Sequence, residues 1–154
     1  MIRARSLAAL AVAGALLGAL VAWWMTSAGL DALPIPWSTP VVLLTMAVVL
    51  VVLGLPVRRW TRGERTPTTK RLDPLRATRT VALAKAAGYA GAIFTGWYFG
   101  LGVGLVTDLE IEPRLARFEQ AMAATLASLA LCSAGLVVER WCRRPPSPDE
   151  DDDA

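Results

Sequence analysis

The stretch that decides the fold class is VALAKAAGYAGAIFTGWYFGLGVGLV, residues 81–106. A transmembrane helix needs roughly 20 consecutive, mainly apolar residues, and this stretch exceeds that length while carrying a single charge, Lys85. Three further runs, at about residues 7–25, 40–57 and 119–138, are also mainly apolar. The sequence therefore predicts an all-α, integral membrane four-helix bundle.

The composition favours lipid as the solvent of much of this chain. It has 154 residues, of which 55% are hydrophobic, and a mean hydropathy of +0.46. A soluble domain of this size has too little interior to bury so much apolar side chain, so residues 1–144 are predicted to form one membrane domain. The run at 40–57 is the shortest and is rich in Val and Leu, which leaves a buried strand as its alternative. The first run ends in Trp23 and Trp24 instead of a small-residue cleavage site, so we expect an uncleaved span.

Positive charge sets the predicted orientation, because short loops rich in Lys and Arg remain in the cytoplasm. Arg3 and Arg5 precede the first run, and Arg140 follows the last. The segment between the second and third runs, residues 58–80, is strongly basic through Arg58, Arg59, Arg62, Arg65, Lys70, Arg71, Arg76 and Arg79. We therefore expect a multi-pass protein of the plasma (inner) cell membrane with both termini in the cytoplasm.

The basic loop at residues 58–80 is the predicted contact surface. Anionic lipid attracts such segments by about 1 kcal/mol per Lys or Arg near the membrane, and a partner protein could meet the same charges. Nucleic acid is not an expected partner, because the loop offers one aromatic residue, Trp60, which is needed at the membrane interface. The tail at residues 145–154 is proline-rich and then acidic, which predicts disorder. This tail could compete with lipid for the loop.

The third helix is expected to begin before the membrane. Asp73-Pro74 combines an N-cap acid with proline at the first helical position. A helix over residues 74–106 would be about 50 Å long at 1.5 Å per residue, which exceeds the apolar core of about 30 Å. Its first turns would therefore hold Arg76 and Arg79 in the cytoplasm or the headgroup layer.

Lys85 is the ionisable residue set clearly within an apolar run. An intramembrane lysine can contact a substrate or a lipid phosphate inside the bundle. It can also extend its stem along lipid so that the ammonium reaches the headgroups, which is the role that its place near the boundary favours. No acidic residue lies in the interior of a span to pair with it, which argues against a proton relay.

Small residues recur every four positions in the third run and form a predicted ridge along one face. The ridge comprises Ala84, Gly88, Ala92, Gly96, Gly100 and Gly104. Gly14 and Gly18 form a shorter pattern of the same kind in the first run. Because small residues let membrane helices approach closely, we expect these positions to pack helices within the chain. A homo-oligomer interface is the alternative.

The residues that catalysis would need are missing from the spans. Intramembrane hydrolysis uses a Ser–His pair, paired acids or a metal, and this chain has no His. Its two cysteines, Cys132 and Cys142, lack a metal-binding spacing. We expect no enzyme activity, no cofactor and no metal site. The outer segment 107–119 carries alternating acids and is expected to be a solvated loop, with divalent-cation binding as the alternative.

The segment RLDPLRATRTVALAKAAGYAGAIFTGWYFG, residues 71–100, resembles the core of a small four-span membrane family found mainly in actinobacteria. The family is catalogued as domain of unknown function 3180. The similarity rests on Asp73-Pro74, on the Ala-Leu-Ala-Lys run that ends at Lys85, and on Gly96-Trp97-Tyr98. The resemblance implies an integral membrane protein with no assigned enzyme activity.

Together these features predict a non-enzymatic scaffold or accessory subunit that meets anionic lipid or a partner protein through its basic loop. The alternative function is a small transporter or permease component that assembles as an oligomer through the glycine ridge, with Lys85 facing a polar path.

Overall fold

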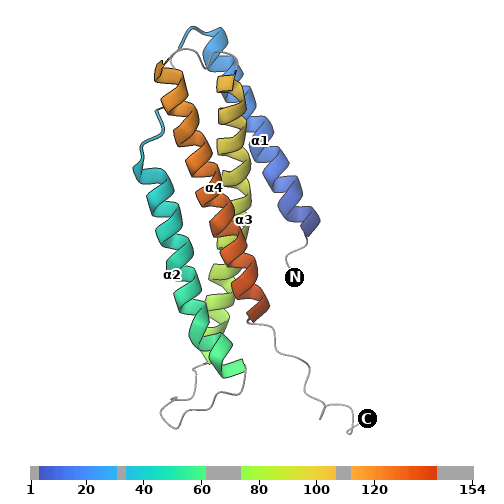
Figure 1. Cartoon of the computed structure of the whole chain (residues 1–154). Coiled ribbons are helices and arrows are strands. Elements are labelled where there is room, and N and C mark those ends of the chain that lie inside the picture. The colour runs from blue at the N-terminus through green and yellow to red at the C-terminus, as the bar shows by residue number, and fades with distance from the viewer. Residues whose placement is uncertain (1–3, 31–33, 62–73, 107–111, 142–154) are drawn as a thin grey trace.

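The described residues fold into four long helices, which confirms the all-α prediction (Figure 1). The computed structural model describes residues 4–30, 34–61, 74–106 and 112–141. The helices are α1 (Ala4–Ser27), α2 (Ser38–Thr61), α3 (Pro74–Leu105) and α4 (Glu112–Trp141). Their directions alternate along the chain, so the start of α1 and the end of α4 both point toward the lower part of Figure 1.

Three of the helices are long and apolar enough to cross a membrane. The qualifying segments are Ala4–Ser27, Ser38–Pro56 and Pro113–Trp141, and the strand alternative for residues 40–57 is excluded because that segment is helical. The helix α3 has 32 residues, which is ample length, but it does not qualify by hydropathy. Its many glycines and its Trp and Tyr residues lower the mean hydropathy of the span predicted at residues 81–106. That span therefore stays a prediction.

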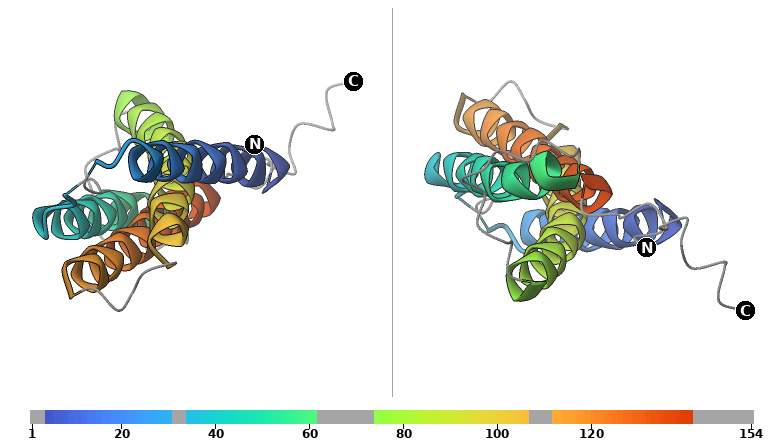
Figure 2. Two further views of the ribbon diagram at one scale, coloured as in Figure 1. Left: turned by 90° about the horizontal axis from the view of Figure 1, so that it is seen from above. Right: turned by 90° about the horizontal axis from the view of Figure 1, so that it is seen from below.

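The helices pack as an open array in which α3 lies between α1 and α4. The extensive interfaces are α1 with α3, α3 with α4 and α2 with α4, whereas α2 and α3 touch only slightly. Figure 2 shows α1 crossing α3 on the side away from α2. The outward faces carry large exposed apolar side chains such as Leu16, Met46 and Leu126. Because burying apolar surface from water drives folding, these uncovered faces are suited to a lipid environment.

The α1–α3 interface is a contact between two backbones. A methyl group placed on Gly14 would lie 2.5 Å from the carbonyl oxygen of Ile93, and one placed on Gly18 would collide with the carbonyl of Trp97. From the other side, methyl groups at Gly96 and Gly100 would collide with the backbone of α1 at Ala11 and Ala15, respectively. Glycine is therefore needed on both helices. Since the residue numbers rise together, α1 and α3 run parallel.

The α3–α4 interface is also a close backbone contact at glycines, on another face of α3. A methyl group on Gly91 would lie 2.6 Å from the backbone nitrogen of Cys132. One on Gly135 would lie 2.7 Å from both the carbonyl oxygen of Ala84 and the backbone nitrogen of Gly88. The residue numbers run in opposite senses, so α4 is antiparallel to α3. Cys132 is buried at this contact, as expected for a small packing residue.

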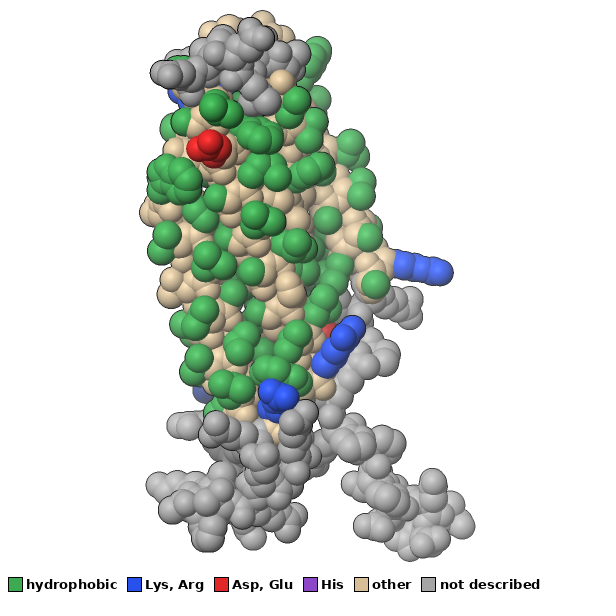
Figure 3. All heavy atoms as spheres, in the orientation of Figure 1, with side chains coloured by type: hydrophobic (Ala, Val, Ile, Leu, Met, Phe, Trp, Pro, Cys, Tyr) green, Lys and Arg blue, Asp and Glu red, His purple; other side chains and the backbone are tan. Residues whose placement is uncertain are grey.

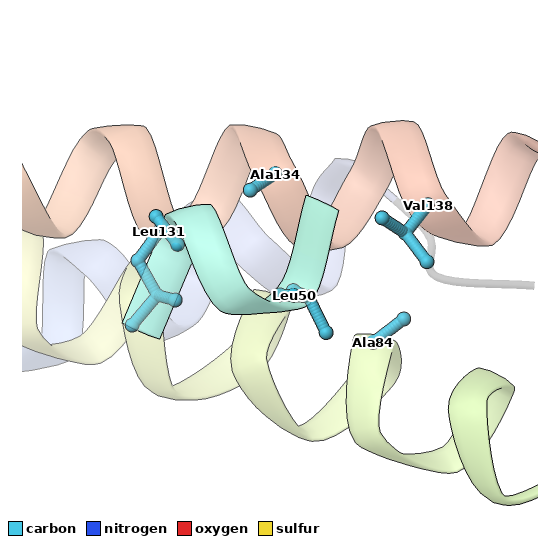
Figure 4. Packing of buried hydrophobic residues seen from close by; sticks show 6 residues of the cluster. Leu50, Ala84, Leu131, Ala134 and Val138 are labelled. Carbon is cyan, nitrogen blue, oxygen red and sulfur yellow. The ribbon is translucent and has the colours of Figure 1, made fainter. Parts of the chain in front are cut away.

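The helix α2 joins the array through α4. A methyl group on Gly54 would lie 2.9 Å from a methyl carbon of Val138, which is fully buried. Near this point Leu50 points toward Ala84 of α3 and Val138 of α4 (Figure 4). These residues form a small apolar cluster with Ala47, Leu131 and Ala134. Three helices therefore converge where α2 and α4 approach their ends.

At the opposite end, the connection after α1 is fixed by backbone and side-chain hydrogen bonds. Gly29 has φ of 68°, and the N–H of Leu30 donates to the carbonyl of Met25 at 2.9 Å, which is a glycine-ended helix terminus. The Gln120 amide of α4, oriented to satisfy both of its neighbours, donates to the carbonyl of Ile35 (2.8 Å) and accepts from the indole N–H of Trp37 (3.0 Å). The connection is thereby bound to the start of α4.

The expected solvated loop at 107–119 is wrong in its second half. Residues 107–111 lie outside the described residues, but α4 begins at Glu112. Pro113 then occupies the first turn, where the missing N–H of proline costs no hydrogen bond. Pro113 is therefore the sequence signal for the start of α4.

Buried hydroxyl groups in the helices are satisfied locally. Thr125 donates to the carbonyl of Ala121 at 2.8 Å, and Ser128 donates to that of Ala124 at 2.7 Å. Within the described part of the chain, no buried side-chain nitrogen or oxygen lacks a hydrogen-bond partner. Such satisfaction is what a helix needs in lipid, where no water completes the bonding.

We predict opposite effects of adding a methyl group at two glycines of α3. In Gly96→Ala the methyl meets the backbone of Ala11, which cannot yield, so overpacking should lower the free energy of unfolding by about 1–3 kcal/mol. In Gly102→Ala the methyl meets only side chains at ordinary contact distance, those of Ala121 and Met122 at 3.7 Å and that of Phe118 at 4.0 Å. That variant should gain about 0.5–1 kcal/mol of helix stability. Circular dichroism during unfolding in detergent measures both, and an equal loss in the two variants would contradict the packing described.

Candidate functional site

The ends of α2 and α4 and the start of α3 form what we term the basic end. Its described cationic side chains are the half-buried Arg58 on α2 and the exposed Arg79 and Arg140 on α3 and α4. Figure 3 shows apolar side chains over the middle of the molecule, with most of the visible Lys and Arg side chains toward its lower part. The structure therefore brings together cations from three helices that are distant in sequence.

An Arg–Trp contact joins α2 and α4 at the basic end. The guanidinium carbon of Arg58 lies 4.8 Å from the centre of the Trp141 ring. An arginine stacked on an aromatic face is attracted by the electron-rich ring and keeps its charge. Trp141 also packs on the apolar cluster around Val138. This contact therefore positions Arg58 rather than leaving it as a mobile surface charge.

A buried acid lies beneath the basic end. Glu139 of α4 is only 6% exposed. Because Gly135 faces Ala84 and Gly88, the next turn places Glu139 opposite the turn from Thr80 to Ala84. Glu139 was not among the predicted site residues, since the fourth run was expected to end at residue 138, before the acid. The helix continues to Trp141 instead. An acidic residue that directly follows an apolar run, within reach of the same helix, was the sequence signal for a buried acid.

Lys85 lies apart from the basic end. Lys85 is six positions after Arg79, which places the two side chains about 120° apart around α3. Lys85 is half-buried and shares a face with Gly96, three turns further on, which is the face that α1 covers. Arg79 and Lys85 therefore lie on different sides of this helix.

The other predicted contact residues divide into two groups. Arg59 lies on α2 and Arg76 lies on α3. The remaining four lie outside the described residues, and these are Arg62, Arg65, Lys70 and Arg71.

The predicted ridge of small residues faces two partners instead of one. Gly96 and Gly100 face α1, as does Gly104, whose added methyl would collide with Ala22. Ala84 and Gly88 face α4 at Gly135. Each step of four residues turns about 40° around the helix, so the ridge winds through roughly half a turn between its ends. Gly14 and Gly18 contribute the α1 side of the first interface.

The chemistry available at the basic end is that of fixed positive charge. Exposed Arg79 and Arg140 can each donate several hydrogen bonds to phosphate or carboxylate oxygens. In the four described segments, no group of three or more His, Cys, Asp or Glu side chains is placed to hold a metal ion.

One family model matches the chain. It carries the description "Protein of unknown function (DUF3180)" and covers residues 7–146. Neither a curated protein nor a solved structure matches the chain. The match includes α2, α3 and α4 in full, and it includes α1 except for residues 4–6.

The Arg58–Trp141 contact predicts a measurable coupling between the two side chains. In a double-mutant cycle of Arg58→Met and Trp141→Leu, the coupling should be about 0.5–1 kcal/mol, as for partly exposed cation–π pairs. Unfolding of the full chain in detergent supplies the four free energies. As a control, Arg117→Met combined with Trp141→Leu should be additive within about 0.5 kcal/mol, because Arg117 lies near the other end of α4. Additivity in the first cycle would refute the contact.

Proposed function

The chain belongs to the family catalogued as domain of unknown function 3180, and we propose that it is a non-enzymatic scaffold or accessory subunit of the plasma membrane. In this proposal all four helices cross the bilayer, with the basic end and both termini at the cytoplasmic face. The basic end contacts anionic lipid headgroups, or a membrane partner that carries acidic groups.

A membrane location for α3 is supported by its packing along α4. The two helices contact each other from Gly102 and Ala121 at one end to Ala84 and Gly135 at the other. A helix that follows a spanning neighbour over this length crosses the same depth. Its modest hydropathy is tolerable because α1 and α4 cover two of its sides and lipid needs to solvate only the remainder.

The observation that carries the proposal is the gathering of positive charge at one end of an apolar array. Arg58, Arg79 and Arg140 come from three helices, and Lys- and Arg-rich segments favour the cytoplasmic side. The cytoplasmic leaflet presents anionic lipid, which attracts each cation near its surface. The concentration of positive charge at one end therefore supports both the proposed cytoplasmic orientation of that end and the proposed binding of anionic lipid.

The transporter alternative receives less support from the arrangement. It requires Lys85 to face a polar path and the glycine ridge to join separate copies. Lys85 instead lies on the side of α3 toward α1, and the glycines at 96 and 100 are already in contact with Ala11 and Ala15 of the same chain. The scaffold function is therefore the one we retain.

The proposal predicts a headgroup preference that depends on the exposed arginines. Reconstitute the full chain in vesicles of equimolar phosphatidylglycerol and phosphatidylcholine, and count retained lipids by native mass spectrometry. In Arg79→Gln/Arg140→Gln the ratio of anionic to zwitterionic lipid should fall about fivefold per residue, from about 1 kcal/mol each. High salt should lower the wild-type ratio too, because exposed charges are screened.

The matched control removes two charges from the other end of α4. Arg114→Gln/Arg117→Gln should leave most of the preference intact, because these residues lie near the start of that helix. An equal effect of the two double variants would show general electrostatics and not a site. No effect of Arg79→Gln/Arg140→Gln would remove the lipid contact from the proposal.

A further inference from the structure

A groove runs between α2 and α3, on the side of the array that α1 does not cover. Its volume is about 590 Å³, which lies within the range of roughly 300–1,000 Å³ typical of ligand sites. Leu43 and Met46 of α2 form one wall, and Leu83 and Phe94 of α3 belong to the other. Leu131 of α4 also contributes to the lining. The groove exists because α2 and α3 both pack on α4 while barely touching each other.

Alanines create the hollow. The α3 wall between Leu83 and Phe94 presents Ala86, Ala87 and Ala90 to the groove. These positions recur at three- and four-residue spacing, so they lie on one face of the helix. The hydroxyl-bearing lining residues Ser38, Thr39 and Tyr98 stand beyond Phe94, at the end away from the basic end. From Leu83 to Phe94 the lining is therefore wholly apolar.

The length of this apolar part suits one lipid chain. Eleven residues separate Leu83 from Phe94, which is about 17 Å along the helix axis at 1.5 Å per residue. The hydrocarbon core of a bilayer is about 30 Å thick, so one leaflet contributes about 15 Å. An acyl chain that enters near Leu83 would thus lie in the groove over the full depth of its own leaflet.

Charge identifies the end at which the headgroup would lie. Arg79 is exposed and precedes Leu83 by four residues, so it continues the groove-lining face of α3 by one turn toward the basic end. Its guanidinium can form two parallel hydrogen bonds to a phosphate. Lys85, on the opposite side of α3, cannot serve this groove.

The shape of the groove disfavours a helix as its occupant. The helices α2 and α3 converge where Leu50 and Ala84 share a buried cluster with Val138 (Figure 4), so the groove narrows toward the basic end. A helix with its side chains is a rod about 10–12 Å across, which cannot follow a narrowing groove. A flexible acyl chain can bend to fill it.

We infer that the α2–α3 groove binds one acyl chain of an anionic phospholipid whose phosphate is held by Arg79. This inference rests on the proposed membrane location and makes it specific, because it assigns a bound lipid in place of a general surface attraction.

The test maps where a lipid chain lies on the full-length protein. Reconstitute the chain in equimolar phosphatidylglycerol–phosphatidylcholine vesicles in which one of the two lipids carries a photoreactive diazirine acyl chain. After illumination, compare labelling of residues 83–94 with that of residues 12–20, an exposed apolar part of α1. The groove-to-α1 ratio should be several-fold higher with labelled phosphatidylglycerol than with labelled phosphatidylcholine. Arg79→Gln should abolish that difference.

Variants that fill the groove with larger side chains provide a second test. Ala86→Leu/Ala90→Leu should reduce groove labelling to the level of α1, whereas Ala82→Leu, an exposed alanine of α3 outside the lining, should not. Equal ratios for the two labelled lipids in the wild type would overturn the inference. So would groove labelling that appears only when the chain is highly diluted, because a second copy would then be the occupant.

The two proposals can fail separately. If anionic lipid is still enriched by Arg79 and Arg140 while the groove is unlabelled, the lipid-contacting function stands and the groove site falls. If neither enrichment nor groove labelling occurs, both fall.

Discussion

The arrangement depends on the close approach of the α3 backbone to two neighbours at once. Gly96 and Gly100 admit the backbone of α1, and Gly91 admits that of α4. In lipid the hydrophobic effect does not drive helices together, so association relies on van der Waals contact and on polar bonds between helices. Any side chain larger than hydrogen at these positions separates the backbones and removes that contact. The glycines are therefore the condition for a three-helix core around α3.

The need for glycine at these contacts also affects the hydropathy of α3. Glycines that permit close packing lower the mean hydropathy, so α3 is the described helix that does not qualify as a span by composition. Its neighbours compensate, because α1 and α4 cover much of its surface. They leave one face of α3 uncovered beside α2, and the alanines there form the groove. Packing on two sides and a lipid-sized hollow on the third thus follow from one distribution of small residues.

Much of the fold could be predicted from the sequence, because its signals are local. Four long apolar runs predicted four helices, and Asp73-Pro74 predicted the start of α3, which begins at Pro74. The pairing of helices is not local, and it was harder to predict. A four-residue repeat was interpreted as one ridge, yet its slow rotation around α3 divides it between α1 and α4.

The site was predictable in its charge but not in its geometry. The basic residues were evident from composition, whereas the Arg58–Trp141 contact joins two helices whose ends meet only in three dimensions. Glu139, which is buried, was missed because the fourth apolar run was expected to end at residue 138, whereas α4 continues to Trp141. The groove had no sequence signal either, since alanines in an apolar helix look the same whether they face lipid, a helix or a hollow.

The most direct test of the central claim asks whether the glycine contacts of α1 and α3 lie within one chain. Replace the native cysteines, attach spin labels at Leu17→Cys and Phe99→Cys, which are exposed positions on the two helices, and measure their separation by electron paramagnetic resonance in bilayers. We predict one narrow distance distribution that persists when labelled chains are diluted with a large excess of unlabelled chains. Loss of that distance on dilution would show that the glycines join separate copies, and it would contradict the structure of the core described above.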